Sequence, residues 1–354
     1  MKKFMIAFLI LPIFLCGCIN NNRNDIENTT LIRIFGIDKT DEGFEVTILY
    51  DASSSDEDKN FQVVSAEAKT VYEAYEKIKQ KCDQQATLSQ TKFFLVGIDA
   101  CKYNIEQSIN FVARHQAIKM DSMVLTLKDK SAKSILEKAK DSKVFLGDTL
   151  KNMQKKEKKI VEHENNTIAR LLERITEYQA TFILPNLNTD EDIPYIDGYN
   201  VFKNMQIVDT LNEKTSMGVD LFSGNVKVSS VYIEDKLGLI ITNIESKLNL
   251  SVINNRIKIT VNTNFITAIR EVLIDDRNLK IMTLMDFCDE QNKYIDNLMQ
   301  HAINYGKETG YDILGIKEIS KKVTGNEMNI DYNNIDFVLN TKSLITKTFD
   351  IERK

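Results

Sequence analysis

The sequence has little of the side-chain chemistry that enzymes and metal sites use. It contains no tryptophan and only three histidines, which are scattered along 354 residues at His115, His163 and His301. His163-Glu164 is followed by two asparagines, so the His-Glu-x-x-His pattern of zinc proteases is absent. No glycine-rich phosphate loop and no Gly-x-Ser-x-Gly elbow occurs either. The sequence therefore predicts a protein that is not an enzyme and holds no metal or cofactor.

An excess of basic residues is also missing. Lysine and arginine total 46 against 51 aspartates and glutamates, which gives a net charge of −5. This acidic balance argues against nucleic acid as a partner. Residues 155–159 are rich in lysine, but they fit a solvated helix face better than a basic groove. Residues 190–192 are acidic, yet they lack the glycine and the final glutamate of a calcium loop.

Cysteines are few, and their spacing contains no CxxC redox or zinc motif. Beyond the N-terminal segment, Cys82, Cys101 and Cys288 remain, and an odd number of thiols cannot all pair. We expect three free thiols that pack as small apolar residues. A disulfide between Cys82 and Cys101 is the alternative.

The N-terminal segment has the order of features found in a bacterial lipoprotein leader. Two lysines precede the apolar residues 4–15, a run of about 12 residues that suits a signal peptide and is too short to span a bilayer. Leu15 stands three residues before Cys18, and the small Gly17 stands directly before it, which is the lipobox pattern. We expect cleavage between Gly17 and Cys18 and a diacylglyceryl group on Cys18. An ordinary secretory leader and an uncleaved membrane anchor are the alternatives.

After cleavage, the attached lipid would be the main anchor of the protein to the membrane. Removing residues 1–17 takes away two lysines and changes the net charge from −5 to −7, so a polybasic grip on anionic lipid is not expected. A diacylglyceryl group carries two acyl chains, which is enough for stable anchoring. Residues 19–30 are polar and without periodicity, so residues 18–30 are predicted to be the lipidated cysteine and a tether.

The next part of the chain, residues 31–190, alternates strand-like and helix-like segments. A length of 354 residues suggests two or three domains, and this stretch is predicted to be an N-terminal domain of α/β type that may subdivide. Strands are expected at residues 31–37, 44–50, 61–68, 93–98 and 123–127. Helices are expected to begin at Thr70, Asn104, Ser131 and Thr167. Together they predict a mixed sheet covered by helices.

The polar residues 185–194 interrupt this pattern, and a domain boundary is placed there. Residues 195–354 are then expected to open with a hairpin at 199–211 and a short helix at 213–222. Further strands are expected at residues 226–233, 238–250, 256–266 and 335–351. A long helix is expected at 279–305, with an apolar stripe that Asn292 interrupts. This C-terminal half is predicted to be an α+β domain with a largely antiparallel sheet and one long helix.

Six short motifs occur in order behind the lipobox. They are Gly36-Ile37-Asp38, Val46-Thr47, Thr70 with the later Lys92-Phe-Phe-Leu-Val-Gly97, Phe111-Val-Ala-Arg114, Gly198-Tyr-Asn-Val-Phe-Lys203 and Asp312-Ile-Leu-Gly315. This order resembles the Ger(x)C family, the lipoprotein C subunit of spore germinant receptors. Two positions depart from the family pattern: Ile19 replaces a tryptophan after the lipidated cysteine, and Gln90 stands where a histidine is common.

The resemblance implies a receptor component and not a catalyst. Members of this family are anchored by lipid on the outer surface of the spore inner membrane, in sporulating Gram-positive bacteria. They act beside two integral membrane subunits in nutrient-triggered germination, and they have an α+β fold in several domains. The resemblance supplies no catalytic or ligand-binding residue.

Two other functions are compatible with a lipid anchor. A solute-binding lipoprotein that feeds a transporter usually has two α/β lobes around a cleft with aromatic ligands. The strand-rich second half and the missing tryptophan disfavour that function here. A purely structural envelope lipoprotein is the remaining alternative.

Overall fold

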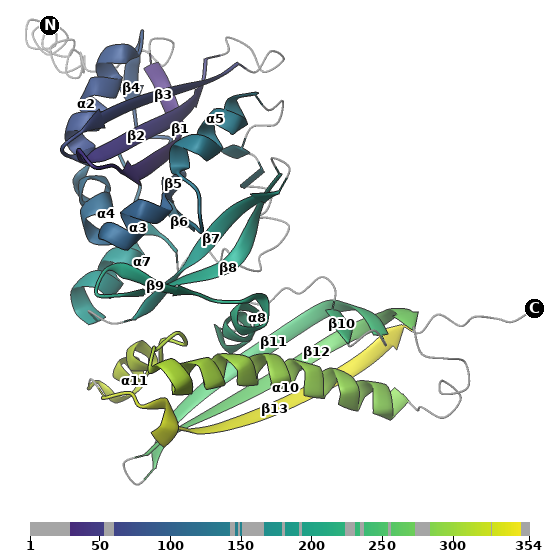
Figure 1. The fold of residues 1–354 in the computed structure, drawn as a ribbon. Helices are drawn as coiled ribbons and strands as arrows, with labels where there is room; N and C mark the ends of the chain where they lie inside the picture. The colour runs from purple at the N-terminus through teal and green to yellow at the C-terminus, as the bar shows by residue number, and fades with distance from the viewer. Residues whose placement is uncertain are drawn as a thin grey trace, which may run out of the picture.

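The chain forms two layered units that follow one another in the sequence (Figure 1). The structure is a computed structural model, and it describes residues 29–52, 60–141, 146–147, 149–150, 166–178, 181–190, 193–223, 231–233, 237–253, 256–272, 284–326 and 328–347. The expected signal peptide, Cys18, most of the tether and the lysine-rich residues 155–159 lie outside these ranges.

The first unit is built on a mixed sheet of nine strands. Their order is β3-β2-β1-β5-β6-β7-β8-β9, with β4 paired to the start of β1. The bounds are β1 Thr29–Lys39, β2 Phe44–Asp51, β3 Phe61–Ala68, β4 Gln85–Thr87, β5 Phe93–Val96, β6 Met123–Leu127, β7 Phe182–Asp190, β8 Ile193–Lys203 and β9 Gln206–Thr210. Pairing is parallel from β1 through β5 and β6 to β7, and antiparallel at both ends of the sheet. The predicted mixed sheet is confirmed.

Helices cover both faces of the parallel strands. They are α2 Val71–Lys81, α3 Ile98–Tyr103, α4 Ile105–Arg114, α5 Ala132–Asp141 and α7 Ile168–Glu173, which continues as the π-helix η2 Arg174–Tyr178. Phe94 packs with α2, α3, α4 and α7 on one face, while its neighbour Phe93 packs with α5 on the other. Burial on both faces explains why β5 is a continuous apolar run, since a parallel strand inside such a sheet has no solvent side.

The local signals that predicted the helix starts are found in the structure. Thr70, Asn104 and Ser131 each accept the backbone N–H of the residue three positions on, at 3.0–3.1 Å. These bonds satisfy donors that have no partner inside the first helical turn. The three predicted caps are confirmed.

The polar residues 185–190, 193 and 194, where a domain boundary is predicted, lie in a hairpin. β7 and β8 pair antiparallel, and Leu187 lies opposite Ile196 in the ladder. The hairpin predicted at 199–211 forms as β8 and β9, but it extends the first sheet and does not open a second one. Tertiary pairing satisfies the backbone of this polar segment, and the first sheet therefore continues through the polar segment to Thr210.

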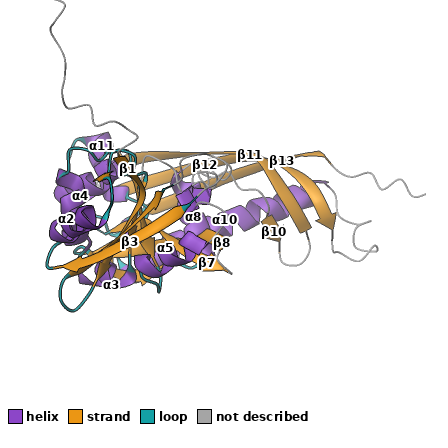
Figure 2. Ribbon diagram, turned by 90° about the horizontal axis from the view of Figure 1, so that it is seen from above, coloured by secondary structure: helices purple, strands orange, loops and turns teal. Residues whose placement is uncertain are grey.

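The second unit contains a four-stranded sheet with one long helix along its face (Figures 1 and 2). Its strands are β10 Val231–Ile233, β11 Leu237–Ile253, β12 Arg256–Val272 and β13 Asp336–Lys347. Its helices are α8 Glu213–Ser223, α10 Leu284–Thr309, α11 Ile316–Thr324 and the short 3-10 helix η3 Tyr332–Asn334. β13 runs parallel to β12, and the other two pairings are antiparallel. The α+β fold with a largely antiparallel second sheet is confirmed.

The buried stripe of α10 differs from the expected one at two places. Leu298, Met299 and Ala302 face the core as predicted, but Met285 is 76% exposed. Gln291 is buried in place of an apolar residue and accepts a hydrogen bond from Thr267 at 2.6 Å. A buried amide is tolerated there because β12 supplies the hydroxyl donor.

The cysteines that the structure describes are all free thiols, as expected. Cys101 is fully buried, and burial raises the pKa of its thiol. In the described part of the chain, no three potential metal-binding side chains come together. Among the helices with described coordinates, none has the length and apolar character needed to cross a membrane.

Candidate functional site

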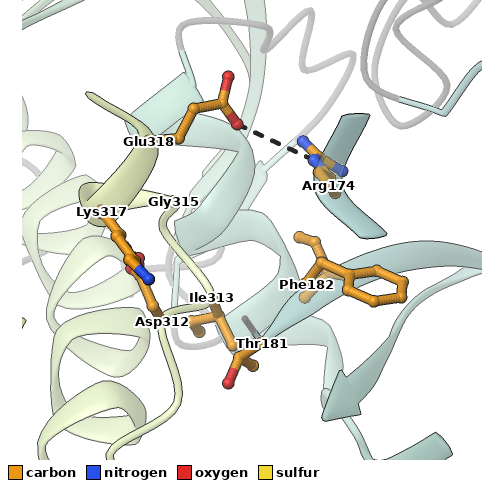
Figure 3. A pocket seen from close by; sticks show the side chains of 9 residues that line it. Arg174, Thr181, Phe182, Asp312, Ile313, Gly315, Lys317 and Glu318 are labelled. Atoms are coloured by element: carbon orange, nitrogen blue, oxygen red, sulfur yellow. Dashed lines mark hydrogen bonds and ion pairs between the residues drawn. The ribbon is translucent and has the colours of Figure 1, made fainter. Parts of the chain in front are cut away.

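A cavity of about 50 Å³ lies where the two units meet (Figure 3). The first unit lines it with Arg174, Thr181 and Ile183, and the second with Asp312, Lys317 and Glu318. A buried water needs about 10–15 Å³ measured in this way, so the cavity has room for roughly three to five water molecules. Phe182 and Ile313 also line it, so its wall combines charged and apolar side chains.

The cavity exists because β7 separates from its neighbour at this end of the sheet. β6 pairs with β7 only at Asn186 and Leu187, whereas β8 pairs along β7 from Phe182 onward. Thr181 and the first two residues of β7, Phe182 and Ile183, line the cavity. Arg174 enters from the junction of α7 with the π-helix η2, a helix type that often marks functional sites.

Asp312 builds the opposite wall by capping α11. Its carboxylate accepts the backbone N–H groups of Ile316 and Lys317, each at 2.8 Å, and the hydroxyl of Tyr332 at 2.8 Å. Burial raises the pKa of Asp312, while the three hydrogen bonds favour its ionised form. This carboxylate satisfies donors at the N-terminus of α11, where the helix dipole also stabilises negative charge.

Glu318 connects the two units through an ion-pair network. Its oxygens lie 2.6 Å from a guanidinium nitrogen of Arg170 and 2.6 Å from Nζ of Lys322. Nε of Arg174 is farther away, at 4.0 Å. Burial opposes ionisation of Glu318, but hydrogen bonds from Lys322 and Arg170 outweigh it, so its pKa is lowered. Burial lowers the pKa of the Arg174 guanidinium.

Other contacts of the first sheet hold α8 and α10 at the junction. The hydroxyl of Tyr305 donates to Asp209 at 2.9 Å, and Tyr199 donates to Asp220 at 2.5 Å. The helices themselves are close-packed, since a Cβ added at Gly218 of α8 would lie 2.2 Å from a backbone oxygen of α10. Figure 1 shows α8 between the two sheets. The cavity therefore lies in a tightly packed junction.

A second buried carboxylate, Asp38, organises the first unit. It extends from β1 and accepts the backbone N–H groups of Ala132 and Lys133 at 2.7 and 2.9 Å, at the start of α5. Burial raises its pKa to about 6, against the opposing effect of these two hydrogen bonds. Asp38 and Asp312 thus perform the same task in the two units, and each belongs to one of the short motifs found in the sequence.

The predicted site residues and the cavity do not coincide. Gly17 and Cys18 lie outside the described residues, and no catalytic, cofactor or metal residue was predicted. Sequence reasoning missed Arg174 and Glu318, which are 144 positions apart and meet only through the packing of the two units. The motif that begins at Asp312 was the one sequence signal at the cavity.

Comparisons with known proteins agree with this architecture. Residues 22–189 match the family model described as "Spore germination protein N-terminal domain", and residues 197–349 match "Spore germination B3/ GerAC like, C-terminal". No curated protein sequence matches the chain. The fold is similar to the solved structure described as "Crystal Structure of the GerBC protein", with a TM-score of 0.53 and 12% identity over 88% of this chain and 97% of that one. The chain belongs to the Ger(x)C family of spore germination proteins.

Proposed function

We propose that this protein is the lipid-anchored C subunit of a spore germinant receptor. The observation that carries the proposal is the pair of family segments, residues 22–189 and 197–349, which together span nearly all of the chain behind the lipobox. In this role it acts with two integral membrane subunits in nutrient-triggered germination. It is not an enzyme, and it works by binding its partners.

The anchor supplies the physical basis for such a role. A diacylglyceryl group on Cys18 holds the two units near the outer face of the spore inner membrane. Tethering raises the effective concentration of the protein near membrane partners, so a modest contact surface is enough for assembly. Residues 19–28 connect the lipid to β1, which begins at Thr29.

Deleting the gene tests the proposal. Growth and sporulation are expected to continue, whereas germination with one class of small nutrient should slow or stop. Triggers that bypass the receptor should still germinate the spores. Wild-type protein should restore the response, and Cys18→Ser should restore it poorly while losing the lipid and its partition into detergent.

The opposite results would reject the proposal. Normal germination with every nutrient tested, together with impaired uptake of one solute by growing cells, would favour the solute-binding lipoprotein. A Cys18→Ser protein that still carries lipid would show that the anchor assignment is wrong. Neither result depends on the other, so the role and the anchor are tested separately.

A further inference from the structure

The predicted tether reaches the first sheet at one defined edge. Residues 19–28 separate Cys18 from Thr29, where β1 begins. A chain of this length spans at most about 33–36 Å when fully extended, and about 16–19 Å as a flexible coil. With the lipid anchor of the proposed function on Cys18, the edge at which β1 starts is therefore the part of the first unit held nearest to the membrane.

The segments that lead into β1, β5 and β6 lie side by side at this edge, because the three strands are parallel. The backbone N–H of Lys92 donates to the carbonyl of Arg33 at 3.2 Å, and that of Met123 donates to the carbonyl of Lys92 at 2.9 Å. β4, which follows α2, pairs with the start of β1. We call this surface the amino edge, and it comprises residues 29–33, 79–92 and 114–122.

Basic residues gather at the amino edge, although the net charge of the chain is −5. Its three ranges contain six lysines and arginines and only two acidic residues, Asp83 and Asp121. The opposite edge of the same sheet contains eight acidic and six basic residues, in the ranges 38–45, 67–73, 97–103 and 128–133. The net charge predicted no polybasic grip on anionic lipid, but the charge of the first unit is unevenly distributed between its two edges.

Several basic side chains of the amino edge are available to a partner. Lys92, Arg114 and Lys119 are exposed, and within the described part of the chain their side chains form no hydrogen bond or ion pair. Met120 follows Lys119 and is 40% exposed. Each lysine or arginine near an anionic lipid surface favours contact by about fivefold. A cationic surface that also presents an apolar side chain therefore fits a layer of anionic headgroups.

We infer that the amino edge rests on anionic lipid headgroups of the membrane that holds the anchor. The inference depends on the anchor of the proposed function, and it adds an orientation to it. The diacylglyceryl group remains the main anchor, while the amino edge turns the first unit toward the surface. The opposite, acidic edge then points away from the membrane, where it avoids repulsion by the anionic lipid.

Lysine accessibility on vesicles tests the inference. The lipidated protein is bound to vesicles of phosphatidylcholine, alone or mixed with phosphatidylglycerol. Its lysines are methylated with formaldehyde and a borane reductant, and mass spectrometry gives the rate at each position. Lys92 and Lys119 should react several-fold more slowly on the mixed vesicles, whereas Lys69 and Lys102 at the opposite edge should react equally on both. Salt at about 1 M should abolish the difference, since the Debye length falls to about 3 Å.

Charge reversal assigns the protection to the amino edge. Lys119→Glu should weaken the contact by more than about fivefold and restore the methylation of Lys92 on mixed vesicles. Lys69→Glu is the matched control, because Lys69 is an exposed lysine of the opposite edge, and Lys92 should stay protected in it. Equal methylation of Lys92 on the two kinds of vesicle, or unchanged protection in Lys119→Glu, would overturn the inference.

Flotation tests the anchor separately. Protein that carries the lipid should float with phosphatidylcholine vesicles at high salt, whether or not the amino edge touches the membrane. Protein that does not float would contradict the anchor of the proposed function, and the inference with it. Protein that floats but shows no protection of Lys92 and Lys119 on mixed vesicles would overturn the orientation alone.

Discussion

The carboxylate of Asp38 occupies the space that a side chain at Gly97 would need. A Cβ added at Gly97 would lie 1.9 Å from Oδ1 of Asp38, far inside van der Waals contact. Asp38 is the last but one residue of β1, Gly97 follows β5, and the carboxylate of Asp38 caps α5. Two motifs separated by more than fifty residues of sequence are therefore parts of one buried arrangement.

Gly97→Ala should destabilise the first unit. The added methyl group has to displace Asp38, and overpacking of this kind costs about 1–3 kcal/mol. Chemical denaturation measures the loss. Adding Asp38→Ala to Gly97→Ala should cost less than the sum of the two single changes, because the clash then disappears. Strict additivity would show that the two residues do not interact.

The contribution of Asp38 to the stability of the protein should fall as the pH rises from about 4 to about 6. Burial raises the pKa of Asp38 from 3.8 to about 6, so the folded state binds the proton more tightly than the unfolded state does. The stabilisation that comes from the tighter binding of this proton in the folded state is complete below pH 4. It is lost as the pH rises through 6, and it amounts to about 3 kcal/mol. The free energy of unfolding of wild type minus that of Asp38→Asn should show this slope. If this difference in free energy did not change with pH, the pKa of Asp38 would be the same in the folded and the unfolded state.

Glu318→Gln should weaken the junction by about 1–3 kcal/mol, since hydrogen bonds between charged groups are lost. Arg170 and Lys322 lose a carboxylate at 2.6 Å, and the half-buried guanidinium of Arg170 keeps only Glu173 among its described ion pairs. Glu308→Gln is the control, because Glu308 lies exposed near the end of α10. Comparable unfolding free energies for the two variants would contradict a structural role of the network.

Leu298→Asp should unfold the second unit, whereas Met285→Asp should be tolerated. Leu298 is 3% exposed, and exchanging it loses about 2–3 kcal/mol of apolar burial and adds the larger cost of burying a carboxylate. Met285 lies on the same helix but is 76% exposed. Hydrogen exchange in β11 and β12 distinguishes the two outcomes. Retained protection in Leu298→Asp would show that α10 does not pack on this sheet as described.

The sequence determined the features that short windows encode. Thr70, Asn104 and Ser131 could be identified as caps because a cap and its donor are three residues apart. The continuous apolar run of β5 and the apolar stripe of α10 could be read because periodicity reports which side chains avoid water. The order of short motifs behind the lipobox indicated the family, since that order can be read without knowing which residues contact each other.

Tertiary structure alone decided which distant segments meet. The polar residues 185–190, 193 and 194 lie in strands because β6, β7 and β8 pair, and no local propensity shows that pairing. Gln291 is acceptable inside the core because Thr267 lies opposite it, and Met285 is exposed although Phe287, two residues further along α10, is buried. Arg174 and Glu318 approach only after the two units pack together. Such contacts depend on the path of the whole chain, whereas a short stretch of sequence carries information only about residues that are close together in the sequence.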